Sequence, residues 1–353
     1  MDFTPAPIVG GIQSNGSSPV TGKAPPMIFL LLPIFGLSPF GLFGNINIII
    51  ATFRKKNFRG KCGILICLLA IYDTICLISE VRGGIMVFYG VSMDRQTCFK
   101  MNIVYFWTQL ISSSTLIGLA FDRLISVTLP LRQACILHHF PLKAFRYRSN
   151  NLAMMLTVST LPGLLLSAVF TILGVIHWDE ENAISPSCSP KGLLLSYIQN
   201  IANWTLLVMN ASVIGIYLTG YIVLFMQRRR NIKQSHLQAV LTSHQRAMRS
   251  LTVFLTVFSA SWFYSQFALS VLLKSNPNDM NGSFLPQTVQ SLIMGSVPAA
   301  LIVSYSQCYY VYFWTSSEYR TAFLEQLGCG KKMWKPKTFK TSVVSVTLQN
   351  MSK

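Results

Sequence analysis

The sequence predicts an all-α membrane protein: a seven-transmembrane helix bundle with its N-terminus outside, its C-terminus inside and a short amphipathic eighth helix. Three observations predict it. Of the 353 residues, 51% are apolar and only 11% are charged, whereas a soluble globular chain carries roughly 25% charged residues. Long apolar stretches recur along the chain, and basic residues gather in alternate segments between them. This composition argues against a water-soluble enzyme, which needs a charged surface, and against a long disordered protein, which is less apolar.

Seven apolar stretches reach the length of about 20 residues that a helix needs to cross the roughly 30 Å hydrocarbon core. They are too long for the strands of a membrane β-barrel. No internal repeat is visible among them, which argues against a transporter built from paired repeats. The stretches are 27–53, 62–89, 99–127, 151–176, 193–226, 248–273 and 287–313.

The orientation follows from the positive-inside rule, because Lys and Arg concentrate on the cytoplasmic side of membrane proteins. Most of the 29 basic residues lie in the segments after the first, third and fifth stretches and in the C-terminal tail. We therefore expect these segments inside and the N-terminus outside. Residues 1–26, rich in Pro, Gly and Ser, are predicted to be an extracellular disordered segment without a cleavable signal peptide.

The membrane domain is expected to span 27–327 and to end in an amphipathic helix over 316–327. Tyr319, Phe323, Leu324 and Leu327 would share one side of this helix, on the inner membrane surface. Residues 328–353 are predicted to form a cytoplasmic basic tail containing Ser and Thr. Cys329, directly after the helix, is a candidate for reversible palmitoylation, although an unmodified cysteine fits the sequence nearly as well.

Ionisable residues inside the apolar stretches carry the functional signal, because each costs about 2.5–3.5 kcal/mol at membrane depth and usually faces the protein interior. Asp73 lies in the middle of the second stretch, and Asp122 and Arg123 lie near the cytoplasmic end of the third. Glu80 and Arg82 lie near the outer end of the second. Two interpretations of Glu80 and Arg82 stay open: a pair that neutralises itself near the interface, or a polar contact inside a ligand pocket.

The predicted topology indicates which cysteines and which glycosylation motifs face the outside. Cys98 and Cys188 face the outside, where disulfides persist, and no Cys/His cluster has metal-site spacing. Asn15 and Asn281 are glycosylation candidates, because both Asn-x-Ser/Thr motifs lie outside. The motifs at Asn203, Asn210 and Asn350 fall in the membrane or the cytoplasm and are interpreted as chance matches.

Several short motifs occur in a fixed order along the chain. They are Gly44-Asn45, LAIYD from Leu69 to Asp73, FDRL from Phe121 to Leu124, Phe258-x-x-Ser-Trp262 and CYYVY from Cys308 to Tyr312. Their order and spacing resemble the rhodopsin-like G-protein-coupled receptors over 27–327. The longer stretches GNINIIIATFRKKNFRGKCGILICLLAIYD, in the first two helices, and YYVYFWTSSEYR, at the end, carry a finer resemblance to the nematode chemoreceptor class Srsx.

The resemblance implies a disulfide between Cys98 and Cys188, G-protein contact through Arg123, and a resting state in which Asp122 holds the Arg123 guanidinium. His244 stands where a second acidic partner is often found, so we expect a weak resting lock and measurable basal signalling. The resemblance also implies a polar core network of Asn45, Asp73 and Ser112, with Ser304 as a further candidate, that holds water or sodium.

This chain departs from the broader family at several positions. Cys308 and Tyr309 stand where Asn and Pro are usual, which argues against sodium binding. Leu124 stands where Tyr is usual, and Tyr264 replaces the kink proline of the sixth helix; the fifth helix also lacks its usual proline. Fewer built-in kinks point to a different activation hinge.

The ligand pocket implied by the resemblance lies in the outer half of the bundle. Tyr105 occupies the position where amine receptors carry an aspartate, which favours a peptide or a small odorant-like ligand over a small amine. The acidic outer loop containing Asp179, Glu180 and Glu181 could attract a cationic peptide or simply be solvated. The pocket candidates, each of which could instead serve core packing, are Glu80, Tyr105, Phe106, Gln109, Trp262 and Gln266.

The expected function is transduction of extracellular ligand binding, by a chemosensory small molecule or a neuropeptide, into activation of a heterotrimeric G protein at the plasma membrane. Expected partners are the ligand, the G protein, membrane lipid and an arrestin recruited by the tail, with no nucleic acid and no cofactor. The alternatives are a seven-helix transporter or a ligand-gated channel. An enzyme is not expected, because the apolar stretches contain no paired catalytic carboxylates and no central histidine.

Overall fold

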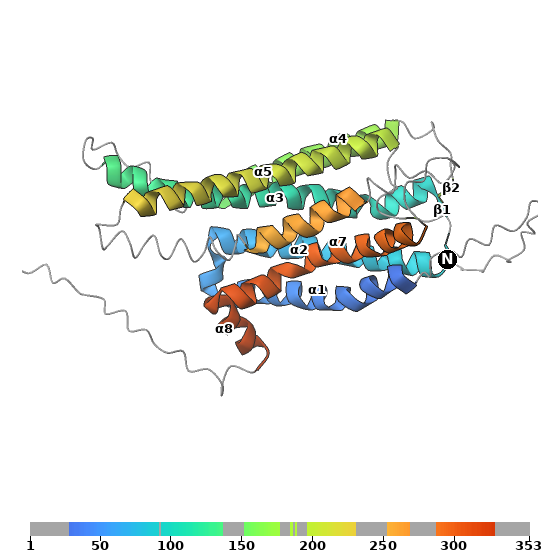
Figure 1. The fold of residues 1–353 in the computed structure, drawn as a ribbon, viewed down its shortest axis with the longest axis horizontal. Helices are drawn as coiled ribbons and strands as arrows, with labels where there is room; N and C mark the ends of the chain where they lie inside the picture. Colours follow the sequence, from blue (N-terminus) through green and yellow to red (C-terminus); the bar gives the residue numbers. More distant parts are fainter. Residues whose placement is uncertain are drawn as a thin grey trace, which may run out of the picture.

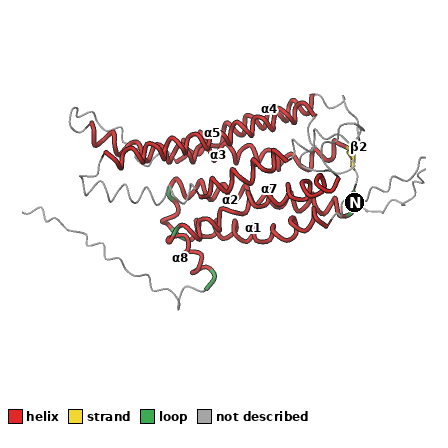
Figure 2. The backbone as a smooth tube through the Cα atoms, viewed as in Figure 1, coloured by secondary structure: helices red, strands yellow, loops and turns green. Residues whose placement is uncertain are grey.

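The computed structural model describes residues 28–91, 93–136, 152–176, 184–185, 188, 196–230, 253–268 and 287–328. These residues form a bundle of long helices that run along one common direction (Figure 1). Almost all of the described backbone is helical (Figure 2). The elements are α1 (Ile28–Arg54), η1 (Lys56–Arg59), α2 (Lys61–Phe88), β1 (Met93–Asp94), α3 (Arg95–Ile136), α4 (Leu152–Ile176), β2 (Ile184–Ser185), α5 (Ser196–Arg230), a helical segment over 253–268, α7 (Gln287–Thr315) and α8 (Ser317–Gln326).

The predicted seven-helix bundle is confirmed, and each expected stretch overlaps a helix among the described residues. Five of the described helices are long and apolar enough to cross a membrane by length and composition: α1, α2, α3, α4 and α5. The main difference in bounds is that α3 continues to Ile136, well past the expected end at 127. Hydropathy marks where a helix leaves the hydrocarbon, whereas a helix already formed extends at little cost in free energy.

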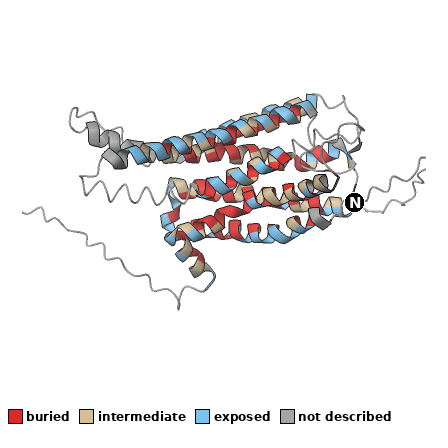
Figure 3. Cartoon of the chain, in the orientation of Figure 1, coloured by how far each residue is buried: buried red, intermediate tan, exposed pale blue. Residues whose placement is uncertain are grey.

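The helix α3 lies at the centre of one half of the bundle, where it packs against α2, α4 and α5, while α1 packs against α2 and α7. Burial follows this arrangement: 56% of the most apolar window of α3 is buried, against 22% for α4 and 28% for α5. The exposed sides of α4 and α5 lie on the outside of the bundle (Figure 3). Because these exposed residues are apolar, including Val158, Leu165 and Ile172 of α4, they suit contact with lipid.

Close helix packing depends on glycine at particular positions. A Cβ atom at Gly163 of α4 would lie 2.7 Å from the Ile111 Cα and 2.8 Å from the Leu110 carbonyl oxygen of α3. A Cβ atom at Gly44 of α1 would lie 2.7 Å from the Cβ of Tyr309 on α7. Small residues that bring backbones together are typical of helix pairs in membranes, where dispersion contacts drive association.

The two ends of the bundle differ in structure. At one end, here called the disulfide end, β1 pairs antiparallel with β2 and Cys98 at the start of α3 bonds to Cys188. At the opposite end, here called the α8 end, α8 leaves the end of α7 and turns away from the bundle axis (Figure 1). The expected orientation, with the disulfide end outside, rests on the distribution of charge and stays a prediction.

The expected amphipathic helix forms as α8, from Ser317 to Gln326. The Ser316 hydroxyl caps its start by accepting from the Tyr319 amide at 3.5 Å. Tyr319 and Phe323 are buried as expected, but Leu327 is 45% exposed. The helix ends one residue before Leu327, so this side chain does not continue the apolar face.

Candidate functional site

Three groups of buried polar residues lie at successive levels between the two ends of the bundle. The first surrounds Arg123 near the α8 end. The second surrounds Asp73, and the third joins Glu80 to two tyrosines nearer the disulfide end. Each group draws residues from α2, from α7 and from α1 or α3. All three therefore lie inside the bundle, where an uncompensated polar group is costly.

Near the α8 end, α3 carries Arg123 toward the start of α2, where its guanidinium interacts with the Cys62 thiol through a side-chain hydrogen bond. Asp122 and Tyr312 of α7 also act on the guanidinium as electrostatic neighbours. Tyr217 of α5 lies within the same electrostatic neighbourhood. The expected partner Asp122 is thus one of the electrostatic neighbours of the guanidinium, and Cys62 is another.

Sequence reasoning missed Cys62, Tyr217 and Tyr312 as neighbours of Arg123. Tyr312 carried a signal, because it ends the CYYVY motif. Cys62 and Tyr217 carried none, since neither is charged at neutral pH and both fit an ordinary apolar helix. Tyr319 of α8 borders the same region. Burial raises the pKa of the Tyr319 phenol, so this hydroxyl stays protonated across the physiological range.

The middle group contains the expected polar core residues Asn45 and Asp73, which are 0% and 6% exposed. The Asn45 amide donates to the Tyr305 carbonyl oxygen of α7 at 3.1 Å. The Asp73 carboxyl acts electrostatically on Cys308 and Tyr305. Cys308, at the position where the broader family has Asn, therefore lies in the electrostatic neighbourhood of Asp73. Ser304 donates to the Leu301 carbonyl oxygen within α7, and Ser112 is half-buried on α3.

The third group joins three of the expected pocket residues through a tyrosine that sequence reasoning did not single out. The Tyr105 hydroxyl donates to the Glu80 carboxylate at 2.9 Å and lies 3.1 Å from the Tyr305 hydroxyl. The Gln109 amide donates to the Tyr305 hydroxyl at 3.4 Å. Glu80, Tyr105 and Gln109 therefore form one network between α2, α3 and α7.

The other expected pocket residues lie in different surroundings. Phe106 contacts the edge of Phe170 with ring centroids 5.9 Å apart, and Trp262 is 2% exposed in the apolar core. Both fit core packing at least as well as ligand contact. Gln266 is half-buried in the helical segment over 253–268.

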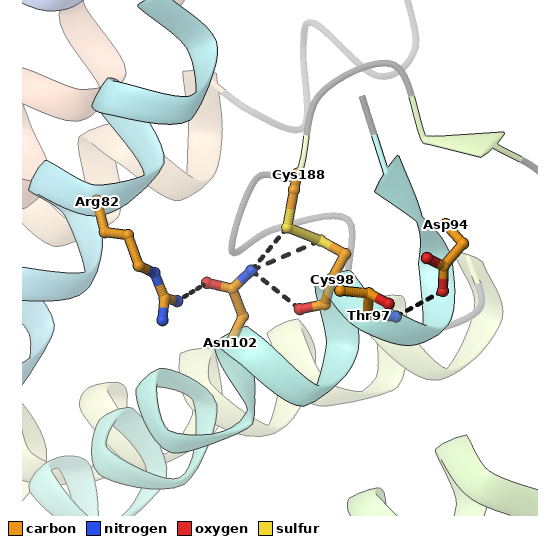
Figure 4. Close-up of a disulfide and its surroundings, with 6 residues drawn as sticks. All are labelled: Arg82, Asp94, Thr97, Cys98, Asn102 and Cys188. Atoms are coloured by element: carbon orange, nitrogen blue, oxygen red, sulfur yellow. Dashed lines mark hydrogen bonds between the residues drawn. A yellow bond between two sulfur atoms is a disulfide. The ribbon is translucent and has the colours of Figure 1, made fainter. Parts of the chain in front are cut away.

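The disulfide has its own polar surroundings (Figure 4). The side-chain amide of Asn102 donates to the Cys188 Sγ at 3.0 Å and to the Cys98 carbonyl oxygen at 3.1 Å. The side-chain oxygen of Asn102, Oδ1, accepts from Arg82 Nη2 of α2 at 2.6 Å. Glu80 and Arg82 therefore do not share a contact that neutralises both. Glu80 turns to Tyr105, and Arg82 turns to Asn102.

Several expected sites lie outside the described residues. They include the glycosylation candidates Asn15 and Asn281, the palmitoylation candidate Cys329, and the acidic loop with Asp179, Glu180 and Glu181. Within the described part of the chain, no group of three or more His, Cys, Asp or Glu side chains is arranged to hold a metal ion.

Comparison with known proteins identifies the family. Residues 38–327 match the model of the serpentine-type seven-transmembrane G-protein-coupled chemoreceptors of class Srsx. The chain belongs to the Srsx chemoreceptor family. The match covers most of the chain, including all three groups of buried polar residues, and it confirms the resemblance predicted from the motifs.

More distant relatives agree with the receptor class. A stretch of 112 residues of this receptor is 25% identical to the human olfactory receptors 52P1 and 51T1. That stretch covers 31% of this chain, 35% of the first receptor and 34% of the second. The chain therefore matches only about a third of the length of either olfactory receptor.

Proposed function

We propose that this receptor converts binding of an extracellular chemosensory ligand at its disulfide end into activation of a heterotrimeric G protein at its α8 end. The observation that carries the proposal is one face of α7. Tyr305, Cys308 and Tyr312 follow one another at spacings of three and four residues, so they share a side of the helix. Tyr305 belongs to the Glu80 network, Cys308 lies in the electrostatic neighbourhood of Asp73, and Tyr312 lies in that of Arg123.

This arrangement offers a physical link between ligand and G protein. A ligand that changes the hydrogen bonds of Tyr305 acts on the same rigid helix that positions Tyr312 next to Arg123. A ligand shifts the population toward an active arrangement only through its stronger affinity for that arrangement. A small rotation or translation of α7 would change the surroundings of Tyr305, Cys308 and Tyr312 together. A ligand that prefers one position of α7 would therefore act on all three levels.

In the proposed resting state, the guanidinium of Arg123 is held within the bundle by Cys62 and its neighbours. In the active state it would be released to contact the G-protein α subunit. Asn45, Asp73 and Ser112 would serve as the polar layer between ligand and coupling region. The basic tail would offer phosphorylation sites for arrestin, and the receptor would reside in the plasma membrane with the disulfide end outside.

The test is G-protein activation in cells that express the wild type or Arg123→Ala, stimulated with nematode peptide and small-molecule extracts. The matched control is Arg59→Ala, which removes a cation at the same end that donates, among the described residues, to the Phe53 carbonyl oxygen. We expect a response that Arg123→Ala abolishes and Arg59→Ala retains, at equal surface expression. An equal response in all three proteins would contradict a coupling role for Arg123.

A further inference from the structure

Arg82 is a cation inside the bundle whose charge no described residue balances. It lies on α2 near the disulfide end and donates from Nη2 to the carbonyl oxygen of Asn102, a neutral side chain that is 2% exposed. Its buried Nε–H has no hydrogen-bond partner among the described residues. Within the same part of the chain, desolvation acts on the guanidinium and no acidic side chain offsets it.

The acid nearest in sequence cannot fill this role in the observed arrangement. Glu80 lies two residues before Arg82, which places the two side chains on different sides of α2. The Glu80 carboxylate accepts from the hydroxyl of Tyr105 on α3, which lies next to the Tyr305 hydroxyl of α7. The two opposite charges are therefore turned to separate groups.

Asn102 fixes the direction of the guanidinium and leaves it open to an anion. The side-chain NH2 group of Asn102 donates to Cys188 Sγ and to the Cys98 carbonyl oxygen. The side-chain oxygen Oδ1 is therefore turned toward Arg82. Only one of the five N–H donors of Arg82 is thereby engaged. The remaining donors of the planar fork suit a carboxylate, which can accept two parallel hydrogen bonds.

We propose that Arg82 is the binding residue for a carboxylate on the ligand, and that Asn102, held by the disulfide, positions it. This inference rests on the proposed receptor function and names its ligand class: an organic acid, supplied either as a small monocarboxylate or as the free C-terminus of a peptide. The ligand supplies the acidic partner that Arg82 lacks among the described residues. Binding then joins α2 to the ligand beside the disulfide.

The first experiment measures the melting temperature of the purified full-length receptor in detergent with matched pairs of probes. The pairs are benzoate and benzamide, hexanoate and hexanamide, and a tetrapeptide with a free or an amidated C-terminus. We expect at least one acid to bind roughly tenfold to hundredfold more tightly than its amide, as hydrogen bonds to a charged group imply. The pair that discriminates distinguishes a small acid from a peptide C-terminus.

Three variants test whether Arg82 causes the preference. Arg82→Gln should abolish it, and Arg82→Lys should reduce it, because lysine keeps the charge and loses the fork. Asn102→Asp keeps the Arg82 side chain, places a carboxylate against it and should abolish the preference, which gives a second test if Arg82→Gln fails to fold. Arg59→Gln, which removes a cation at the α8 end of the bundle, should leave the preference for the acid unchanged.

Two results would overturn the inference. In one, no acid stabilises the wild type more than its amide, or the preference survives Arg82→Gln and Asn102→Asp. In the other, neutralising Asp179, Glu180 and Glu181 together destabilises the receptor as much as Arg82→Gln, which would make a loop acid the partner of Arg82. If the receptor signals through Arg123 but shows no preference for acids, this inference alone is overturned. If it prefers acids but does not signal, only the proposed G-protein coupling is overturned.

Discussion

The rings of Phe58 and Tyr319 stack face to face, with centroids 4.3 Å apart and planes 7° from parallel. Phe58 belongs to η1, between α1 and α2, and Tyr319 belongs to α8. Tyr319 also contacts Tyr312 of α7 at 4.9 Å, and Tyr312 lies in the electrostatic neighbourhood of Arg123. The position of α8 is thereby tied to the region around Arg123 through aromatic rings.

Phe58→Ala is expected to loosen α8. The substitution removes a buried ring and its stacking contact, and changes of this kind cost about 3–5 kcal/mol in protein cores. Hydrogen–deuterium exchange of the α8 amides should accelerate, with little change in the amides of α4, which is remote from the contact. Unchanged exchange in α8 would show that the stack does not hold this helix.

The matched control is Lys55→Ala at the same junction. Lys55 forms an ion pair with Glu325 of α8, and both side chains are nearly half exposed, at 45% and 46%. Exposed ion pairs contribute only about 0–1 kcal/mol. Exchange in α8 should therefore change much less in Lys55→Ala than in Phe58→Ala.

The bundle itself was predictable from the sequence because each helix had to be apolar over the thickness of a membrane. The position of Cys98 against Cys188 and the helix over 316–327 followed from the family resemblance and from amphipathic spacing. The position of Leu327 did not follow, because spacing alone cannot tell where a helix ends. The end of α3 at Ile136 escaped prediction for the same reason: polar residues beyond the membrane can continue a helix.

Gly163→Ala is expected to push α4 away from α3. The new Cβ would approach the Ile111 Cα and the Leu110 carbonyl oxygen, and backbone atoms cannot move aside as a flexible side chain can. Overpacking of this kind costs about 1–3 kcal/mol, and the melting temperature of the purified receptor should fall.

Gly215→Ala is the control for this substitution. Gly215 is also in a helix, α5, but a Cβ there would meet no atom within 4 Å. Alanine is the better helix former by about 1 kcal/mol. The melting temperature should stay the same or rise, and an equal fall in both variants would contradict the close-approach argument.

Cys62→Val is expected to raise basal G-protein activation. The substitution keeps the size of the side chain and removes the thiol that interacts with Arg123 in this structure. A hydrogen bond is worth about 1 kcal/mol net, which shifts a two-state population about fivefold. Basal activation should rise by that order in transfected cells at equal surface expression.

Cys62→Ser and Asp122→Asn complete this test. Serine keeps a hydrogen-bonding group at the same position, so basal activation should remain near the wild-type level. Asp122→Asn removes a nearby charge but not the thiol contact. If Asp122→Asn activates the receptor more than Cys62→Val does, then Asp122 is the principal resting partner of Arg123, as the family resemblance implied.

The candidate site was less predictable than the fold, because its partners are mostly uncharged. The sequence singled out Glu80 and Arg82 as costly charges inside the membrane, and both have polar partners in the structure. The sequence could not decide whether Glu80 and Arg82 pair with each other or with different residues, since side-chain directions depend on how α2 and α3 pack. Tyr305, Asn102 and Cys62 gave no signal of their own, because tyrosine, asparagine and cysteine are all common in membrane helices.

The start of α3 should depend on pH through Asp94. The Asp94 carboxylate accepts from the Thr97 amide at 2.8 Å, in the manner of a helix N-cap. This hydrogen bond lowers the pKa of Asp94 below its ordinary value. Because the folded pKa is depressed, the stabilisation is present above the ordinary pKa and is lost as the pH falls through the folded pKa.

Hydrogen exchange of the Thr97 amide, corrected for the intrinsic pH dependence of exchange, measures this effect. Its protection should decline in the acidic range for the wild type. Asp94→Asn retains an acceptor for the cap and cannot titrate, so its protection should stay constant with pH. Asp94→Ala should be unprotected at every pH. A decline in Asp94→Asn that matches the wild type would assign the pH dependence to another group.

Loss of the Cys98–Cys188 bond should destabilise the disulfide end. The bond closes a loop with a sequence separation of 90 residues, and removal of such a native bond typically costs about 2–5 kcal/mol. Without the bond, the Cys188 sulfur that accepts from Asn102 is no longer tied to α3, so the side chain that positions Arg82 loses part of its support. Cys98→Ser and Cys188→Ser should each lower the melting temperature of the purified receptor by a similar amount.

The double variant should be no less stable than either single variant, because all three lack the same bond. Additive losses in the double variant would show that the two cysteines stabilise the receptor separately rather than through the bond.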